Sequence, residues 1–225
     1  MISTPSLVLA LGILALGLWA DIHVELPGQL AIGAVVWALL LAMLSRLPAA
    51  ERRMFLACVV IATAGELFLS LVWGLYIYRL ENVPMFVPPG HALMLMLGLA
   101  LSRRLPETAA RAIIGAAGIY ALGAGVAGID TLALPLFLVL LVATLSLPGH
   151  TRLFASTFAL CLGLELYGTA LGNWFWQREV PWVGLATTNP PGVAGAFYAA
   201  LDALTLAILA IPVATRRRAA ALAAG

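Results

Sequence analysis

The chain has 225 residues, of which 63% are hydrophobic and only 10% are charged, with a formal net charge of +2. Soluble proteins average about 45–50% apolar and about 25% charged residues. This composition excludes a single water-soluble domain, and with it a nucleic-acid-binding module, a secreted disulfide scaffold and a soluble nucleotide enzyme. The mean hydropathy of +1.06 predicts an integral membrane protein. All 12 basic residues are arginine, a bias typical of GC-rich bacterial genomes.

Eight apolar segments approach or exceed the length of roughly 20 residues that a membrane-spanning helix needs. They lack the strict apolar–polar alternation of strands in a membrane β-barrel. We therefore predict an all-α integral membrane protein with eight transmembrane helices. In chain order they cover residues 5–20, 28–46, 54–78, 90–102, 109–127, 131–148, 153–175 and 194–214. Cys58 and Cys161 fall inside these segments and are expected to be buried free thiols.

The distribution of arginine predicts how the spans are oriented. With eight spans, ten of the twelve arginines lie on one side of the membrane, while Arg79 and Arg178 lie on the other side among acidic loop residues. Cytoplasmic loops are enriched in Lys and Arg, so both termini are predicted to be cytoplasmic, in a bacterial inner membrane. The cytoplasmic group consists of Arg46, Arg52, Arg53, Arg103, Arg104, Arg111, Arg152, Arg216, Arg217 and Arg218. The opposite acidic group consists of Asp21, Glu25, Glu81, Asp130 and Glu179.

The third and seventh segments share a pattern that indicates an internal repeat. Each has Arg, Glu and Arg spaced by 13 residues, and the two sets are 99 residues apart: Arg53, Glu66 and Arg79, then Arg152, Glu165 and Arg178. Both sets are followed by paired aromatic residues (76–78 and 174–176) and by Pro-Pro-Gly (88–90 and 190–192). The segments are four spans apart and therefore parallel. We predict two parallel four-helix repeats, residues 1–106 and 107–225, within one membrane domain.

Glu66 and Glu165 are the candidate catalytic residues. Each lies 13 residues, about 20 Å of helix, from an arginine on either side, which predicts a position near the middle of the bilayer. An ionisable group there costs at least about 2.5 kcal/mol on insertion scales and usually faces the bundle interior or a wet cavity. A buried carboxylic acid is suited to donate a proton. The alternative is a neutral Glu whose hydrogen bond only holds two helices together.

Polar and aromatic residues near the two glutamates are candidates for a substrate-binding site. Hydroxyl groups one turn after each Glu would orient the carboxyl group or hold a water, unless they bond to their own helix. Aromatic rings toward the outer ends would either anchor the protein at the interface or stabilise a cation in a site. The candidates are Ser70, Trp73, Tyr76, Tyr78, His91, Thr169, Asn173, Trp174, Trp176, Asn189 and Asp202.

Two of these candidates have special positions. His91 follows the first Pro-Pro-Gly turn, which places it at the outer mouth, within reach of Glu66 only if the loop folds inward; the alternative is a structural role. Asp202 is a third intramembrane acid, and its counterpart after the first Pro-Pro-Gly is Ala100, so the two halves differ there. Arg79 and Arg178 are expected to anchor the helices at the interface or to bind an anionic headgroup.

No metal site or cofactor is predicted. Asp21, His23 and Glu25 are metal-ligand types, but they form one short loop without a second cluster. The three histidines, at 23, 91 and 150, do not form the paired histidines within helices that a haem or di-iron membrane oxidase needs.

Glu66, Gly74-Leu-Tyr76-Ile-Tyr78, Val83-Pro84 and Val87-Pro88 form a pattern within residues 66–91. It resembles that of the membrane carotenoid hydratases of the bacterioruberin and monocyclic-carotenoid pathways, which carry an intramembrane Glu, a Gly-x-Tyr-x-Tyr stretch and Val-Pro turns. This chain differs in having Arg79 where a hydroxyl residue is expected and His91 where Trp is expected. The resemblance implies a hydratase that adds water to a carotenoid or another isoprenoid.

Three functional hypotheses follow. The first is an intramembrane enzyme in which protonated Glu66 or Glu165 donates a proton to a double bond of an apolar isoprenoid or lipid, followed by water addition. Its site would lie between the third, fourth, seventh and eighth spans. The second is a small proton-coupled transporter or lipid flippase. The prolines concentrate in the loops instead of interrupting a helix in the middle of the membrane, which argues against this hypothesis. The third is a non-catalytic subunit of a membrane complex. The expected ligand is a membrane lipid or isoprenoid. The expected protein partner is a second copy of this chain or another membrane subunit, and no nucleic acid is expected to bind.

Overall fold

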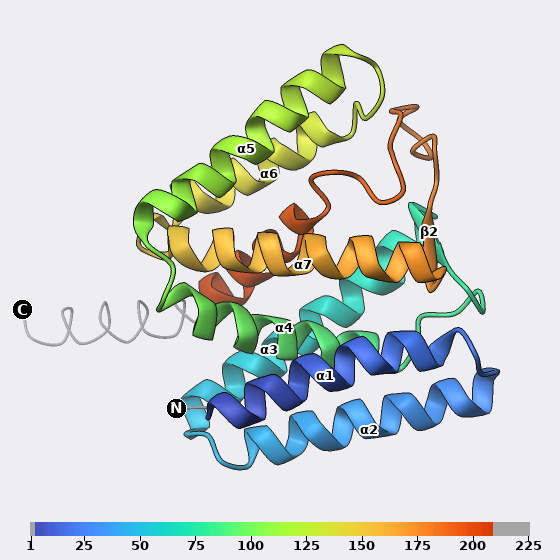
Figure 1. The fold of residues 1–225 in the computed structure, drawn as a ribbon, viewed down its shortest axis with the longest axis vertical. Coiled ribbons are helices and arrows are strands. Elements are labelled where there is room, and N and C mark those ends of the chain that lie inside the picture. The colour runs from blue at the N-terminus through green and yellow to red at the C-terminus, as the bar shows by residue number, and fades with distance from the viewer. Residues whose placement is uncertain (1–2, 209–225) are drawn as a thin grey trace, which may run out of the picture.

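The structure is a computed structural model that describes residues 3–208 (Figure 1). The end of the eighth predicted span, residues 209–214, and the arginines Arg216, Arg217 and Arg218 lie outside the described residues. The helices are α1 (Thr4–Asp21), α2 (Leu26–Leu44), α3 (Ala49–Glu66), which continues as the π-helix η1 (Leu67–Val72), α4 (Val87–Ser102), α5 (Glu107–Val126), α6 (Ala133–Ser146), the short 3-10 helix η2 (Pro148–His150), α7 (Thr151–Leu171) and a last helix, Gly195–Ile208. Two short strands are β1 (Tyr76–Tyr78) and β2 (Trp174–Trp176).

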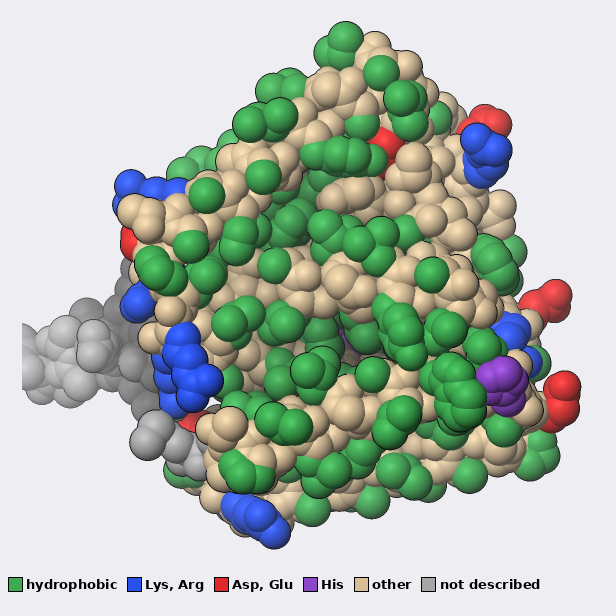
Figure 2. All heavy atoms as spheres, in the orientation of Figure 1, with side chains coloured by type: hydrophobic (Ala, Val, Ile, Leu, Met, Phe, Trp, Pro, Cys, Tyr) green, Lys and Arg blue, Asp and Glu red, His purple; other side chains and the backbone are tan. Residues whose placement is uncertain are grey.

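The predicted all-α membrane class is confirmed. Five helical segments between residues 3 and 208 are long and apolar enough to cross a membrane, and α4, α6 and the last helix are shorter apolar helices. The five are Thr4–Asp21, Leu26–Leu44, Ala49–Val72, Glu107–Val126 and Pro148–Leu171. Figure 2 shows apolar side chains across the middle of this face and charged side chains gathered toward the two ends of the helices. Such an extensive apolar surface is unusual for a water-soluble monomer.

Helix α4 lies in the centre of the helix assembly. It packs against α1, α2, α3 and α7. Nine of its 16 residues are buried, so this short helix belongs to the core. Its close approach to α7 requires a glycine: a Cβ at Gly98 would overlap the methyl group of Thr157. Helices α5 and α6 pack against each other and also contact α7, to which they are inclined (Figure 1).

The helices of the third and seventh predicted spans end earlier than expected. The first ends at Val72 instead of residue 78, and α7 ends at Leu171 instead of residue 175. Gly74 and Gly172 follow these ends with φ of +71° and +86°, a left-handed conformation that glycine adopts readily and that terminates helices. The chain therefore does not continue as a helix to Arg79 or Arg178.

Because these helices end early, both glutamates lie closer to a helix end than the sequence predicts. Glu66 and Glu165 each lie six residues before the end of their helical segment. They are not midway along an uninterrupted helix between two arginines, as the sequence spacing indicates. Each glutamate is therefore near enough to the helix end for the returning chain to reach it.

The returning segments form an antiparallel pair of strands. Tyr76 pairs with Trp176 and Tyr78 with Trp174, and all four of these side chains are buried. Backbone hydrogen bonds extend the pair on both sides, from Arg79 N to Asn173 O (2.9 Å) and from Gln177 N to Leu75 O (3.0 Å). Alternate residues of a strand point to the same face, so the four rings share the face that looks back toward the helices.

Candidate functional site

Glu66, the last residue of α3, contacts three polar side chains. Oη of Tyr76 and Oη of Tyr78 donate hydrogen bonds to its Oε2 at 2.8 and 2.7 Å. Nε2 of His91, in the first turns of α4, lies 2.8 Å from its Oε1. The tyrosines reach Glu66 because the chain reverses after Gly74. These contacts surround both oxygens of a side chain that is only 7% exposed.

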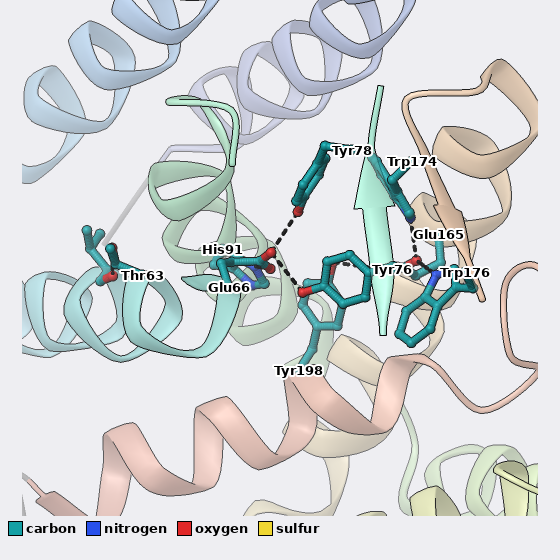
Figure 3. A network of polar contacts seen from close by, with 10 residues as sticks. Thr63, Glu66, Tyr76, Tyr78, His91, Glu165, Trp174, Trp176 and Tyr198 are labelled. Carbon is teal, nitrogen blue, oxygen red and sulfur yellow. Dashed lines mark hydrogen bonds and ion pairs between the residues drawn. The ribbon is translucent and has the colours of Figure 1, made fainter. Parts of the chain in front are cut away.

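Glu165, on α7, has a matching set of contacts. Nε1 of Trp174 and Nε1 of Trp176 donate to its Oε2 at 2.8 and 3.0 Å. Oη of Tyr198, on the last helix, donates to its Oε1 at 3.1 Å. Glu165 is 5% exposed. In both sets, two aromatic side chains of a strand bond to one carboxyl oxygen, and one side chain of a following helix contacts the other (Figure 3).

Both glutamates line one cavity of about 230 Å³. Its polar lining comes from the two carboxyl groups and their partners, and its remaining walls are apolar. Those walls include Leu14 and Leu18 of α1, Val36 of α2, Met94 of α4 and Leu201 of the last helix. A mostly apolar cavity with a few converging polar groups is the usual form of a small-molecule binding site.

The two sets of partners differ in how they can handle a proton. An indole N–H only donates, whereas a phenol or an imidazole nitrogen can exchange the roles of donor and acceptor. Oε2 of Glu165 therefore cannot carry a proton while it accepts from both tryptophans. Glu66 can take up or release a proton at either oxygen, because its partners are Tyr76, Tyr78 and His91. The arrangement lets Glu66 exchange a proton at either oxygen, and Glu165 only at Oε1, where its partner is the hydroxyl of Tyr198.

Tyr76 and Tyr78 lie in strand β1, outside the helices. Burial, and after it the adjacent carboxylate of Glu66, raises the pKa of each phenol well above its ordinary value. Both hydroxyl groups therefore remain protonated and can donate to Glu66 when it is ionised.

Seven of the predicted site residues line this cavity: Glu66, Tyr76, Tyr78, His91, Glu165, Trp174 and Trp176. His91 is part of the cavity wall and does not stay at an outer mouth. The walls also involve α1 and α2, which the predicted site between four spans omitted. The remaining six predicted residues lie elsewhere.

The two hydroxyl candidates do not serve the carboxyl groups as expected. Thr169 Oγ1 donates to the backbone carbonyl of Glu165 at 2.7 Å, the bond to its own helix that was the alternative. Ser70 lies buried in the π-helix, and neither residue is among the described residues that line the cavity. Trp73 instead donates to the carbonyl of Pro181 at 2.7 Å and stacks on Trp182.

The other three candidates lie outside the cavity, and two of them, Asn173 and Asn189, support strand β2. Nδ2 of Asn173 donates to Oδ2 of Asp21 at 2.9 Å, and Oδ1 of Asn189 accepts from the backbone N of Trp176 at 3.0 Å. Both contacts hold strand β2 in place. Asp202 is buried in the last helix, and its Oδ2 has no hydrogen-bond partner among residues 3–208.

Tyr198 is the site residue that sequence reasoning missed. It bonds to Glu165 and stacks on His91 with ring centroids 4.7 Å apart, so it connects the two sets of contacts. A signal existed: Tyr198 is on the helix after the second Pro-Pro-Gly, as His91 is on the helix after the first. His91 is one residue after the first Pro-Pro-Gly and Tyr198 is six residues after the second, and this five-residue difference hid the correspondence.

Three residues predicted on the outer side of the membrane make contacts within the protein. Asp21 and Asp130 are fully buried. Arg79 donates to the backbone carbonyls of Asp21 and Val24, and its Nε lies 3.7 Å from Oδ2 of Asp21, so its guanidinium group is engaged within the protein. Arg178, in contrast, is exposed. The buried carboxylate of Asp21 explains this difference between the two arginines.

Comparisons with models of protein families, with curated proteins and with solved structures find no match for this chain. A proposed function therefore has to be argued from the site itself. Its features are two carboxyl groups, their six hydrogen-bonding partners and one mostly apolar cavity.

Proposed function

We propose that this protein is an intramembrane enzyme that adds a proton, and then water, to a carbon–carbon double bond of an apolar isoprenoid or lipid. The observation that carries the proposal is that Glu66 and Glu165, each surrounded by hydrogen-bond donors, line the same apolar cavity. A carboxylic acid in an apolar site is suited to protonate a weak base such as an alkene.

The resemblance to carotenoid hydratases supports an isoprenoid substrate. It includes Glu66, Tyr76 and Tyr78, and these three residues are in direct contact although the tyrosines are 10 and 12 residues away in the chain. The apolar walls favour a hydrocarbon chain over a polar substrate. A cavity of about 230 Å³ accommodates the reacting end of a long polyene.

The reaction proceeds in two balanced steps. Protonated Glu66 transfers its proton to one carbon of the double bond, which leaves the Glu66 carboxylate and a carbocation on the other carbon. Tyr76, Tyr78 and His91 then donate to the new carboxylate and stabilise it. A water molecule forms the new carbon–oxygen bond to the carbocation, and its surplus proton returns to Glu66. Ionised Glu165, which accepts from two indole donors, stabilises the carbocation in between.

Each half of the chain contributes one glutamate and its donors, and this supports two parallel repeats at 1–106 and 107–225. The spacing differs by one residue: Glu66 and Tyr76 are 10 apart, whereas Glu165 and Trp174 are 9 apart. The π-helix Leu67–Val72 accounts for the difference, because a π-helical turn accommodates one extra residue. We propose eight spans on this basis.

We further propose that the protein resides in a bacterial inner membrane with both termini in the cytoplasm. The distribution of arginines supports this orientation. In the described structure, Arg46, Arg103 and Arg104 follow helix ends, and Arg52 is in the first turn of α3, all at the end of the helices opposite to β1 and β2. The cavity glutamates are then nearer to the outer side of the membrane.

The test is hydration of a linear polyene carotenoid by the purified protein in lipid vesicles prepared in ¹⁸O-labelled water. Mass spectrometry is expected to detect a product heavier by one labelled water, and Glu66→Gln and Glu165→Gln are each expected to abolish it. Glu107→Gln is the matched control, because Glu107 pairs with Arg111 at the surface. Full activity of the Glu66→Gln, Glu165→Gln double variant would rule out this mechanism.

Proton-coupled transport is the second candidate, and one observation favours it. The π-helix that begins directly after Glu66 interrupts the regular hydrogen bonding of α3 at the carboxyl group. Interrupted helices at a binding site are typical of transporters. Proton flux into vesicles that depends on Glu66, without any hydrated product, would favour transport. A membrane protein that always co-purifies with this chain would instead favour a subunit role.

A further inference from the structure

The cavity is lined by more acidic than basic side chains. Glu66 and Glu165 both line it, and no arginine lines it within the described part of the chain. Arg79 is already engaged with Asp21 and with two backbone carbonyls. His91 is the basic side chain in the cavity wall.

The hydrogen bonds of His91 indicate a neutral ring. Its Nε2 contacts Glu66, whereas its buried Nδ1 has no hydrogen-bond partner among residues 3–208. An imidazolium carries a proton on both nitrogens, and the proton on Nδ1 would then be a buried donor without an acceptor, which is unfavourable. The ring therefore provides no positive charge to balance the glutamates.

When the two glutamates are ionised, hydrogen-bond donors for both carboxylates are already in place. Three phenol O–H groups, two indole N–H groups and Nε2 of His91 point at the four carboxyl oxygens. A carboxylate accepts at both oxygens, whereas a carboxylic acid must donate at one of them. Negative charge in an apolar cavity is costly unless a positive charge accompanies it, and among residues 3–208 no arginine lines the cavity to supply one.

We infer that the cavity binds hydrophobic cations, that is, an aliphatic chain with a single positive centre placed between Glu66 and Glu165. This inference rests on the proposed function for the location of the site and adds the class of ligand. The carbocation of the proposed reaction is the transient member of that class, and an alkyl ammonium ion is a stable member. The apolar walls accept the chain, and the carboxylates attract the charge.

The aromatic side chains add a second attraction. Trp176 lies between Tyr76 and Phe197, with ring centroids 4.8 and 6.0 Å away, and all three residues line the cavity. Ring faces attract cations within about 6 Å, most strongly when water is absent. An uncharged hydrocarbon of the same shape gains the contact with the walls but neither the charge attraction nor the cation–π contact.

The test compares dodecyltrimethylammonium with the neutral hydrocarbon that has carbon in place of nitrogen. The full-length protein in nanodiscs of neutral phosphatidylcholine is titrated with each probe, and binding is followed by the change in tryptophan fluorescence. The ammonium ion is expected to bind at least about tenfold more tightly, a ratio that corresponds to about 1.4 kcal/mol. Equal affinity for the two probes would overturn the inference without any variant.

Two variants locate the effect. Glu165→Gln and Glu66→Gln are each expected to reduce the preference for the ammonium ion and to leave hydrocarbon binding unchanged, which also reports that the cavity is folded. Glu107→Gln is expected to keep the full preference. A preference that persists in the Glu66→Gln, Glu165→Gln double variant would overturn the inference.

The outcomes separate this inference from the proposed function. Preference for the ammonium ion without any hydration activity supports the cation site, rejects the hydratase and favours proton-coupled transport of a hydrophobic cation. Hydration activity without a preference for the ammonium ion supports the enzyme and rejects the cation site.

Discussion

Tyr76 and Trp176 are opposite each other in the β1–β2 pair, with ring centroids 4.8 Å apart, yet their polar atoms bond to different glutamates. Tyr76 donates to Glu66 and Trp176 donates to Glu165. One pair of short strands therefore positions donors for both carboxyl groups, and a displacement of either strand is expected to disturb both.

Gly168→Ala is expected to displace Trp174 from Glu165. A Cβ at this position would overlap the indole ring of Trp174, and such overpacking costs about 1–3 kcal/mol. We expect a lower thermal unfolding temperature, altered tryptophan fluorescence and weaker ammonium binding in the cavity. Gly163→Ala, on the same helix, is the control, because a Cβ there meets no atom within 4 Å among the described residues. Equal behaviour of the two variants would contradict the packing argument.

Arg79→Gln is expected to destabilise the protein, whereas Arg178→Gln is not. Arg79 bonds to two carbonyl groups and approaches the fully buried Asp21. Hydrogen bonds that involve a charged group contribute about 1.5–3 kcal/mol, while substitutions of exposed residues such as Arg178 usually change stability by about 0.5 kcal/mol or less. Thermal unfolding in matched detergent measures the difference. A larger loss for Arg178→Gln would show that the headgroup role predicted for both arginines is the relevant one.

Deletion of Leu71 is expected to be tolerated better than deletion of Leu166. The two leucines are 54% and 53% exposed and each follows a glutamate of the site. Removal of one residue from the π-helix leaves a regular α-helix with the same exit direction. Removal of one residue from the regular α7 rotates everything after it by about 100°. The burial of Cys58 and Cys161, measured by their reaction with a thiol reagent, and ammonium binding in the cavity are expected to be retained after deletion of Leu71 and lost after deletion of Leu166. The opposite result would contradict the interpretation that the π-helix contains one inserted residue.

Asp130→Asn is expected to loosen the segment that leads into the last helix. The fully buried Asp130 accepts hydrogen bonds from Tyr120, Thr187, Thr188 and the backbone N of Gly192. Asparagine is uncharged and has one acceptor oxygen instead of two, so its hydrogen bonds with these four donors are weaker than those of the carboxylate, at a cost of about 1–3 kcal/mol. Hydrogen exchange at Gly192 is expected to accelerate. Glu179→Gln, at an exposed position, is the control and is expected to leave this exchange unchanged.

Composition and local pattern were sufficient for the class of protein. The high apolar content and the long apolar segments predicted helices in a membrane, because a lipid environment requires every backbone polar group to be satisfied within the segment. The predicted segments correspond in order to the described helices, with errors at their ends. The symmetric positions of Glu66 and Glu165 also follow from the sequence alone, since a matched spacing is a property of the chain.

The geometry of the site was decided by the tertiary structure. In a continuous helix, a residue 10 to 12 positions after Glu66 is about 15–18 Å away, and Tyr76 and Tyr78 would not reach the carboxyl group. They reach it because Gly74 reverses the chain and because β1 finds its hydrogen-bonding partner in β2, about 100 residues later. His91 and Tyr198 join the site through the packing of two further helices. Such contacts depend on which distant segments meet, and no local pattern of residues contains that information.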